Sequence, residues 1–203
     1  MYSPAQAHST QSAQLHIIFG PMFAGKTTRL LTLYQQITTQ PKVIIGWAQD
    51  DRSNGHLKSH NPQLETIPLD LCVQELKDVL HESSYINACH VFIDEGQFFG
   101  DLSDIVQVMV HSHRKTVYLS GLYSDYQATP FANMTRALAH AQIIECLHSK
   151  CDMCGDIAVY SCLKDPLQDT SKQNKDAFVL VGGTNLYSPR CAIHRTFISQ
   201  IKT

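Results

Sequence analysis

The sequence has no strong excess of charge of either sign. Its 203 residues include 16 Lys and Arg against 18 Asp and Glu, which gives a formal net charge of −2. Proteins that bind DNA, RNA or an anionic membrane through a broad surface usually carry an excess of basic residues. We therefore expect no nucleic-acid partner, although a local basic groove would still be compatible with this composition.

Long apolar runs are also missing. No run approaches the roughly 20 residues of a membrane-spanning helix, so we expect no membrane partner. Residues 1–14 are small and polar, without the basic start and apolar centre of a secretory signal, and we interpret them as a flexible N-terminal tail. Seven Cys is an odd number for a disulfide framework. It favours a reducing, cytoplasmic location in which some Cys bind a metal.

An alternation of strand and helix patterns occupies most of the chain. Short apolar runs predict five strands, at residues 15–19, 42–48, 90–94, 116–120 and 142–147. Helical periodicity predicts four helices, at residues 26–39, 71–81, 102–113 and 132–141. This order predicts an α/β fold, a mostly parallel sheet with helices on both faces.

Two regions depart from this alternation. Residues 49–62 are polar, with Gly55 and Asn61-Pro62, and we interpret them as a loop. The pattern changes again after residue 147, where Cys-rich turns and a polar stretch begin. We therefore expect an α/β nucleotide-binding domain at residues 15–147 and a small second domain at residues 148–203.

The segment GPMFAGKT lies between the first strand and the first helix and fits the phosphate-loop pattern G-x-x-x-x-G-K-[ST]. In such a loop the backbone N–H groups and the helix N-terminus face phosphate oxygens. The Lys reaches the β- and γ-phosphates, and the final hydroxyl binds Mg²⁺. We expect ATP to be bound by Gly20, Pro21, Met22, Phe23, Ala24, Gly25, Lys26 and Thr27.

Two carboxylates follow the third strand in the segment VFIDEGQFF. In a phosphate-loop protein an Asp at this place faces the metal, so we expect Asp94 and Thr27 to bind Mg²⁺. The neighbouring Glu95 has two possible roles. It can orient a water, as in an ATPase, or accept the proton of a substrate hydroxyl, as in a kinase.

The second region contains two metal-binding half-sites. Cys151-x-x-Cys154 and Cys191-x-x-His194 supply four ligands, which suits a closed, structural tetrahedral zinc site. The remaining cysteines lack this spacing, although Cys162 is near enough in sequence to compete as a ligand. Between the half-sites, the Gly182-Gly183 pair is either a β-turn beneath the zinc site or a place where backbone closely approaches a flat ligand.

The combination of GPMFAGKTT, IDEGQFF, the paired half-sites and VGGTNLY resembles the type II thymidine kinase family, over about residues 15 to 197. The resemblance implies a P-loop NTPase-type α/β domain followed by a small zinc-binding domain with a substrate-covering loop, the lasso. It implies transfer of the γ-phosphoryl group of ATP to the 5′-hydroxyl of thymidine, and of deoxyuridine, in nucleotide salvage. It also implies Mg²⁺, structural Zn²⁺, a cytoplasmic homotetramer and dTTP as a feedback inhibitor.

The resemblance also assigns individual roles. Glu95 matches the catalytic base. Positions matching the ATP site are Gly20–Thr27, Asp50, Arg52, Asp94, Glu95, Gly96 and Gln97. Positions matching the thymidine site are Leu122, Tyr126, Phe131, Phe178, Val179, Leu180, Val181, Gly182 and Tyr187.

A few positions depart from the family pattern. Thr27 replaces the commoner Ser, Tyr126 stands where Phe is usual, and Ser120 precedes Gly121 where many members differ. Asp51 adjoins Asp50, which leaves open which of the two acts. A second interpretation of the whole sequence is a phosphate-loop ATPase whose zinc knuckle binds nucleic acid.

Overall fold

The computed structural model describes residues 13–49, 55–57, 65–164 and 186–195. Six strands form one sheet in the order β5-β2-β6-β7-β1-β8, and each neighbouring pair is parallel. The strands are β1 (Leu15–Phe19), β2 (Lys42–Trp47), β5 (Leu71–Val73), β6 (His90–Ile93), β7 (Thr116–Gly121) and β8 (Ile143–Cys146). The predicted parallel α/β fold is confirmed.

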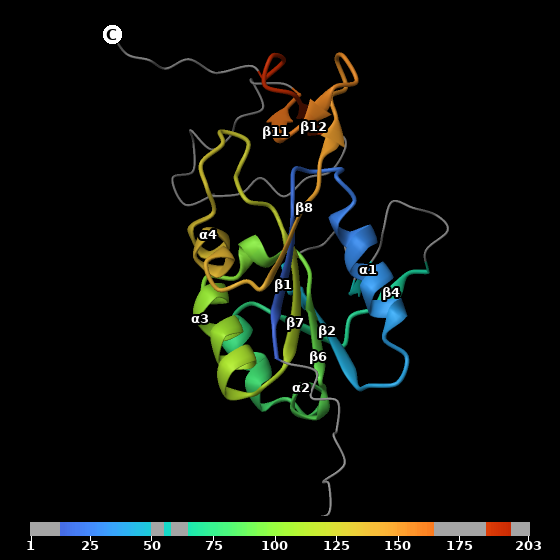
Figure 1. Cartoon of the computed structure of the whole chain (residues 1–203), viewed down its shortest axis with the longest axis vertical. Coiled ribbons are helices and arrows are strands. Elements are labelled where there is room, and N and C mark those ends of the chain that lie inside the picture. The colour runs from blue at the N-terminus through green and yellow to red at the C-terminus, as the bar shows by residue number, and fades with distance from the viewer. Residues whose placement is uncertain (1–12, 50–54, 58–64, 165–185, 196–203) are drawn as a thin grey trace, which may run out of the picture.

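Helices cover both faces of this sheet (Figure 1). One face carries α1 (Lys26–Gln36), and the other carries α2 (Ser83–Asn87), α3 (Leu102–Gln107) and α4 (Ala132–Leu138). Three of the four predicted helices are present with shorter bounds, and a π-helical turn, Val108–Ser112, continues α3.

The predicted helix at residues 71–81 is wrong in its first part. Leu71–Val73 is a strand that pairs with the edge of β2, and only Leu76–His81 is helical, as a 3-10 segment. The pattern of apolar residues in this segment fits a helix and also a strand. Pairing with the open edge of the sheet at β2 favours the strand. The Asp101 carboxylate accepts hydrogen bonds from the backbone N–H groups of Leu76 and Lys77, which starts the 3-10 segment separately.

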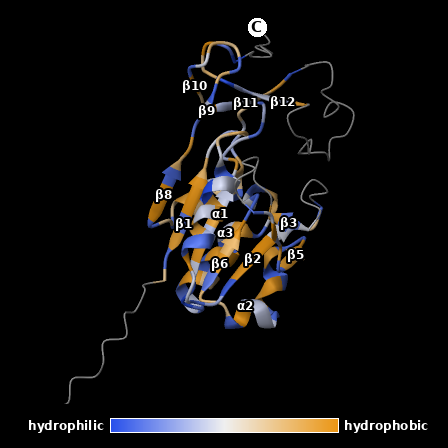
Figure 2. Ribbon diagram, turned by 90° about the vertical axis from the view of Figure 1, so that its right-hand side faces the viewer, coloured by the Kyte–Doolittle hydropathy of each residue, from blue (hydrophilic) through white to orange (hydrophobic). Residues whose placement is uncertain are grey.

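The core lies on both sides of the sheet, because alternate strand residues point to opposite faces. Ile17, Ile45 and Ile93 belong to the core beneath α3 and α4, and Ile18 and Phe92 to the core beneath α1. Figure 2 shows the resulting apolar strands. Such continuous apolar strands are typical of parallel sheets covered on both faces.

Short antiparallel pairs complete the described chain. Beyond β8 lie β9 (Ser149–Lys150) with β10 (Ile157–Ala158), and β11 (Tyr160–Leu163) with β12 (Tyr187–Arg190). We call these four strands and their turns the zinc lobe; they lie beyond the carboxyl ends of the sheet strands (Figure 1).

The pair β3 (His56–Leu57) and β4 (Ile67–Pro68) places a strand inside the expected loop at residues 49–62. The domain boundary near residue 147 stays a prediction. None of the helices in the described ranges is long and apolar enough to cross a membrane.

Candidate functional site

The candidate site lies where the carboxyl ends of β1, β6 and β7 meet. In open parallel sheets, ligands bind outside these strand ends. The phosphate loop follows β1, the two carboxylates follow β6, and Leu122 follows β7. The parallel topology therefore brings three sequence motifs together that are far apart along the chain.

The phosphate loop makes a tight turn between β1 and α1. Phe23 and Gly25 have left-handed φ angles of 63° and 84°. At Gly20, a side chain would collide with the backbone carbonyl of Leu147, so only glycine fits there. Lys26 Nζ donates a hydrogen bond to the Pro21 carbonyl at 2.9 Å, which places its ammonium over the loop.

Asp94 links the acidic motif to the phosphate loop. Thr27 Oγ1 donates a hydrogen bond to Asp94 Oδ2 at 3.2 Å, and Ser120 Oγ donates to Asp94 Oδ1. Burial and the nearby Glu95 carboxylate raise the pKa of the Asp94 carboxyl above its usual range, against the opposing effects of the Ser120 hydrogen bond and the Lys26 charge. A hydroxyl and a carboxylate in this arrangement are oxygen ligands that suit Mg²⁺, so the residues fit that ion.

The Glu95 side chain lies beside Asp94 in a pocket. The backbone of Glu95 has a left-handed conformation, with φ 53°. Gln97 Nε2 donates to Glu95 Oε2 at 2.7 Å, and Gln97 Oε1 accepts from the Leu122 N–H at 2.8 Å. The pocket is lined by Gly46, Trp47, His56, Leu57, Leu69, Asp94 and Glu95.

Two aromatic pairs lie in this part of the chain, and Trp47 of the first pair lines the pocket with Asp94 and Glu95. The Trp47 ring stacks on Phe98, with their centroids 4.5 Å apart. The rings of Tyr126 and Tyr187 approach to 6.5 Å, so two of the expected thymidine positions come together from distant segments. Phe131, a third expected position, is partly buried against the core. Asp50, Arg52 and Phe178–Gly182 lie outside the described residues.

The four expected metal ligands form one cluster. The candidate ligand atoms of Cys151, Cys154, Cys191 and His194 all lie within 4.8 Å of one another. Cys154 Sγ lies 3.8 Å from Cys191 Sγ, and Cys191 Sγ lies 3.3 Å from His194 Nδ1. Tetrahedral zinc with Zn–S bonds of about 2.3 Å separates two sulfurs by about 3.8 Å, so the donor set fits zinc. Cys162 lies in β11 and is not part of this cluster.

The zinc lobe contacts the phosphate loop, which no sequence motif indicated. The Met22 N–H donates a hydrogen bond to Ser161 Oγ at 2.8 Å across a separation of 139 residues. Ser149 Oγ donates to the Phe23 carbonyl of the loop at 3.4 Å. The lobe also contacts the segment after β7, where the Tyr123 hydroxyl donates to the Val159 carbonyl. The lobe that carries the metal cluster is therefore hydrogen-bonded to the phosphate loop.

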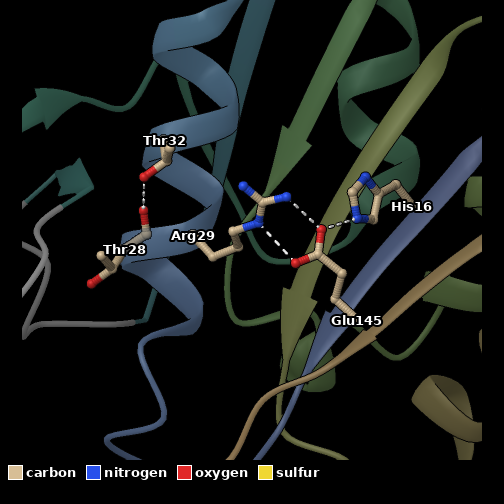
Figure 3. A network of polar contacts seen from close by, with 5 residues as sticks. All are labelled: His16, Thr28, Arg29, Thr32 and Glu145. Carbon is tan, nitrogen blue, oxygen red and sulfur yellow. Dashed lines mark hydrogen bonds and ion pairs between the residues drawn. The ribbon is translucent and has the colours of Figure 1, made fainter.

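A second network, also missed by the sequence analysis, joins α1 to the edge of the sheet (Figure 3). Arg29 Nε and Nη2 donate to Glu145 Oε2 and Oε1, both at 2.8 Å. The buried His16 Nε2 lies 2.7 Å from Glu145 Oε1. Burial lowers the pKa of His16, and the Arg29 guanidinium lowers the pKa of Glu145. This network fixes β8, the strand that leads into the zinc lobe, to the helix that follows the phosphate loop.

Comparison with known proteins identifies related chains. The family model described as thymidine kinase matches residues 13–195. A thymidine kinase of Mycoplasma genitalium is 30% identical over 203 residues, covering 98% of this chain and 90% of the relative. One of Coprothermobacter proteolyticus is 32% identical, covering 91% of each chain. A cytosolic thymidine kinase of Cricetulus griseus is 30% identical over 75% of this chain and 64% of its own.

Proposed function

The chain belongs to the thymidine kinase family, and on this premise we propose that it transfers the γ-phosphoryl group of ATP to the 5′-hydroxyl of thymidine in nucleotide salvage. One observation on this chain's own residues supports the proposal. The phosphate loop, the Thr27–Asp94 pair and the Glu95 carboxylate converge at the carboxyl ends of the central strands β1 and β6. A phosphoryl donor and an acceptor hydroxyl need this arrangement.

The proposed mechanism assigns one task to each group. The loop amides and Lys26 bind the triphosphate and neutralise the charge that develops on it. Thr27 and Asp94 would hold Mg²⁺, which supplies further charge neutralisation when bound. Glu95 accepts the 5′-hydroxyl proton while the bond from the 5′-oxygen to the γ-phosphorus forms. The bond between that phosphorus and the oxygen bridging to the β-phosphate breaks, and ADP leaves.

Finer points of the proposal concern ligands and assembly. Deoxyuridine differs from thymidine by one methyl group, which a pocket discriminates by only about 1–3 kcal/mol, so we expect it to be an acceptor. Inhibition by dTTP, a cytoplasmic location and the ATP and thymidine contacts of Asp50, Arg52 and Phe178–Gly182 rest on the family resemblance. A homotetramer is supported by the same resemblance, and by the exposed apolar side chains of Ile143 and Ile144 on the edge strand β8.

The rival function is a phosphate-loop ATPase whose zinc knuckle binds nucleic acid. The thymidine kinase match over residues 13–195 disfavours it, and so does the net charge of −2. In the zinc lobe, the positive charge of Arg190, which could contact a nucleic acid, is paired with Asp152 within the protein.

Phosphate transfer from γ-labelled ATP tests the proposal directly. Acceptors would be thymidine, deoxyuridine, deoxycytidine, a purine nucleoside, single-stranded DNA and water, each with Mg²⁺. We expect label on thymidine and deoxyuridine alone. Label released only as inorganic phosphate, with stimulation by DNA, would establish the ATPase instead.

A further inference from the structure

We propose that Gln97 is a positioning residue for the Glu95 carboxylate, and that it does not act as a contact to ATP. The inference rests on the proposed function, in which Glu95 is the base. It gives a separate role to a side chain that the family resemblance places in the ATP site.

The Gln97 side chain bridges the ends of two neighbouring strands. It is 7% exposed and lies in the 3-10 turn Gly96–Phe98 that follows β6. Its Nε2 donates to Glu95 Oε2 at 2.7 Å, and its Oε1 accepts from the Leu122 N–H, just beyond β7, at 2.8 Å. Both ends of the amide therefore make a hydrogen bond within the protein.

The chemistry of the partners fixes which way the amide faces. A backbone N–H only donates, so the amide oxygen of Gln97 must face Leu122. The NH₂ group then faces Glu95, whose ionised carboxylate only accepts. The reversed amide would place two donors together at one end and two acceptors together at the other. The two hydrogen bonds therefore hold the amide in a single orientation.

The amide of Gln97 is buried and lies near the backbone of Gly121. A Cβ atom on Gly121 would lie 2.8 Å from Gln97 Oε1, so the backbone at the end of β7 closely approaches the amide oxygen. The absence of a side chain at Gly121 therefore leaves the space that the Gln97 amide oxygen needs in order to accept from Leu122. A buried amide held by two hydrogen bonds can orient a flexible carboxylate in a way that bulk water cannot.

The orientation of Glu95 matters because proton transfer requires a specific geometry. The carboxylate must lie within hydrogen-bond reach of the acceptor hydroxyl while that oxygen attacks phosphorus. Without Gln97 the Glu95 carboxylate loses the hydrogen bond that orients Oε2, and displacement of a catalytic group by about 1 Å can cost on the order of 100-fold in rate.

The first test is Gln97→Met, which keeps the length of the side chain and removes both hydrogen bonds. We expect kcat to fall about 10- to 100-fold, with KM for ATP and thymidine changing less than about 3-fold. Calorimetric titration with ADP should give an unchanged Kd. A raised KM and a raised Kd with kcat intact would show that Gln97 contacts the nucleotide, and would overturn the inference.

A double-mutant cycle with Glu95→Gln shows whether Gln97 acts through Glu95. If it does, adding Gln97→Met to the Glu95→Gln variant lowers kcat by less than about 2-fold, because the orienting partner has no base left to orient. Two independent, multiplicative losses would overturn the inference. If Glu95→Gln lowers kcat and Gln97→Met does not, the inference alone fails; if Glu95→Gln is fully active, the base assignment fails and the inference with it.

Two further variants separate positioning from damage to the fold. Gly121→Ala places a methyl group against Gln97 Oε1 and shifts the amide without deleting it, so an intermediate loss of kcat is expected. Gln107→Met, on α3, is the matched control, because Gln107 Nε2 also donates a hydrogen bond, to the Ser103 carbonyl at 3.0 Å. It should keep wild-type kcat. Should Gln97→Met not fold, Gly121→Ala decides: wild-type kcat in that variant would overturn the inference.

Discussion

Replacing Glu145 with Ala removes the acceptor that Arg29 and His16 share (Figure 3). Arg29 and Glu145 are 36% and 24% exposed, so solvent screening limits their ion pair to about 1 kcal/mol. His16 is buried, and its Nε2 then loses its partner at a cost of about 1–3 kcal/mol. The free energy of unfolding should therefore fall by about 2–4 kcal/mol, which in a chain of this length lowers Tm by roughly 5–15 °C.

Calorimetric unfolding at pH 7 measures this shift. Glu145→Gln keeps an oxygen that can accept from His16 and loses only the charge, so it should lie between Glu145→Ala and the wild type. Asp104→Ala is the control. It removes the pair of Asp104 with Arg136, whose side chains are 66% and 57% exposed, and it should move Tm by less than about 2 °C. Equal shifts for Glu145→Ala and Asp104→Ala would contradict this prediction, because burial of the network would then contribute nothing to stability.

Three further predictions concern the metals and pH. Ser120→Ala removes the hydroxyl that orients Asp94, and it should weaken Mg²⁺ binding in the presence of ADP by about 10-fold, as read by calorimetric titration; an unchanged Mg²⁺ affinity would exclude this role. Chelation of zinc, or Cys191→Ser, should lower Tm and also weaken ATP binding, because Ser161 of the zinc lobe holds the phosphate loop; loss of Tm alone would show that the two are uncoupled. Because burial lowers the pKa of His16 in the folded state, the unfolded chain takes up this proton first as pH falls below about 6.5, and stability is lost from there down to the folded pKa. His16→Gln should therefore make Tm less dependent on pH between 7 and 5, and an unaltered dependence would contradict it.

The sequence predicts those parts of the fold that depend on patterns within a short segment of the chain. The strands that carry the phosphate loop and the acidic motif are continuous apolar runs, and their parallel pairing follows from the helices between them. The spacing of the half-sites that begin at Cys151 and Cys191 is enough to predict metal ligands. The segment at residues 71–81 shows the limit, because its apolar residues suit a helix or an edge strand, and only the free edge of β2 decides.

The contacts that sequence reasoning missed join residues far apart in the chain. Arg29 and Glu145 are separated by 116 positions, and His16 and Glu145 by 129. Each of these side chains alone resembles a solvated surface residue or a core histidine, and no spacing rule connects them. Gln97 could be found as part of a motif, but its partner at Leu122 depends on how β6 and β7 lie side by side.

The hydrogen bond between Met22 and Ser161 has a consequence for the order in which the protein matures. The ribosome produces the phosphate loop first and its partner hydroxyl 139 residues later. The α/β strands can pair while the zinc lobe is still being synthesised, but one amide of the loop has no side-chain acceptor until β11 emerges and folds. A nascent chain therefore cannot form this contact to the phosphate loop before β11 has been synthesised.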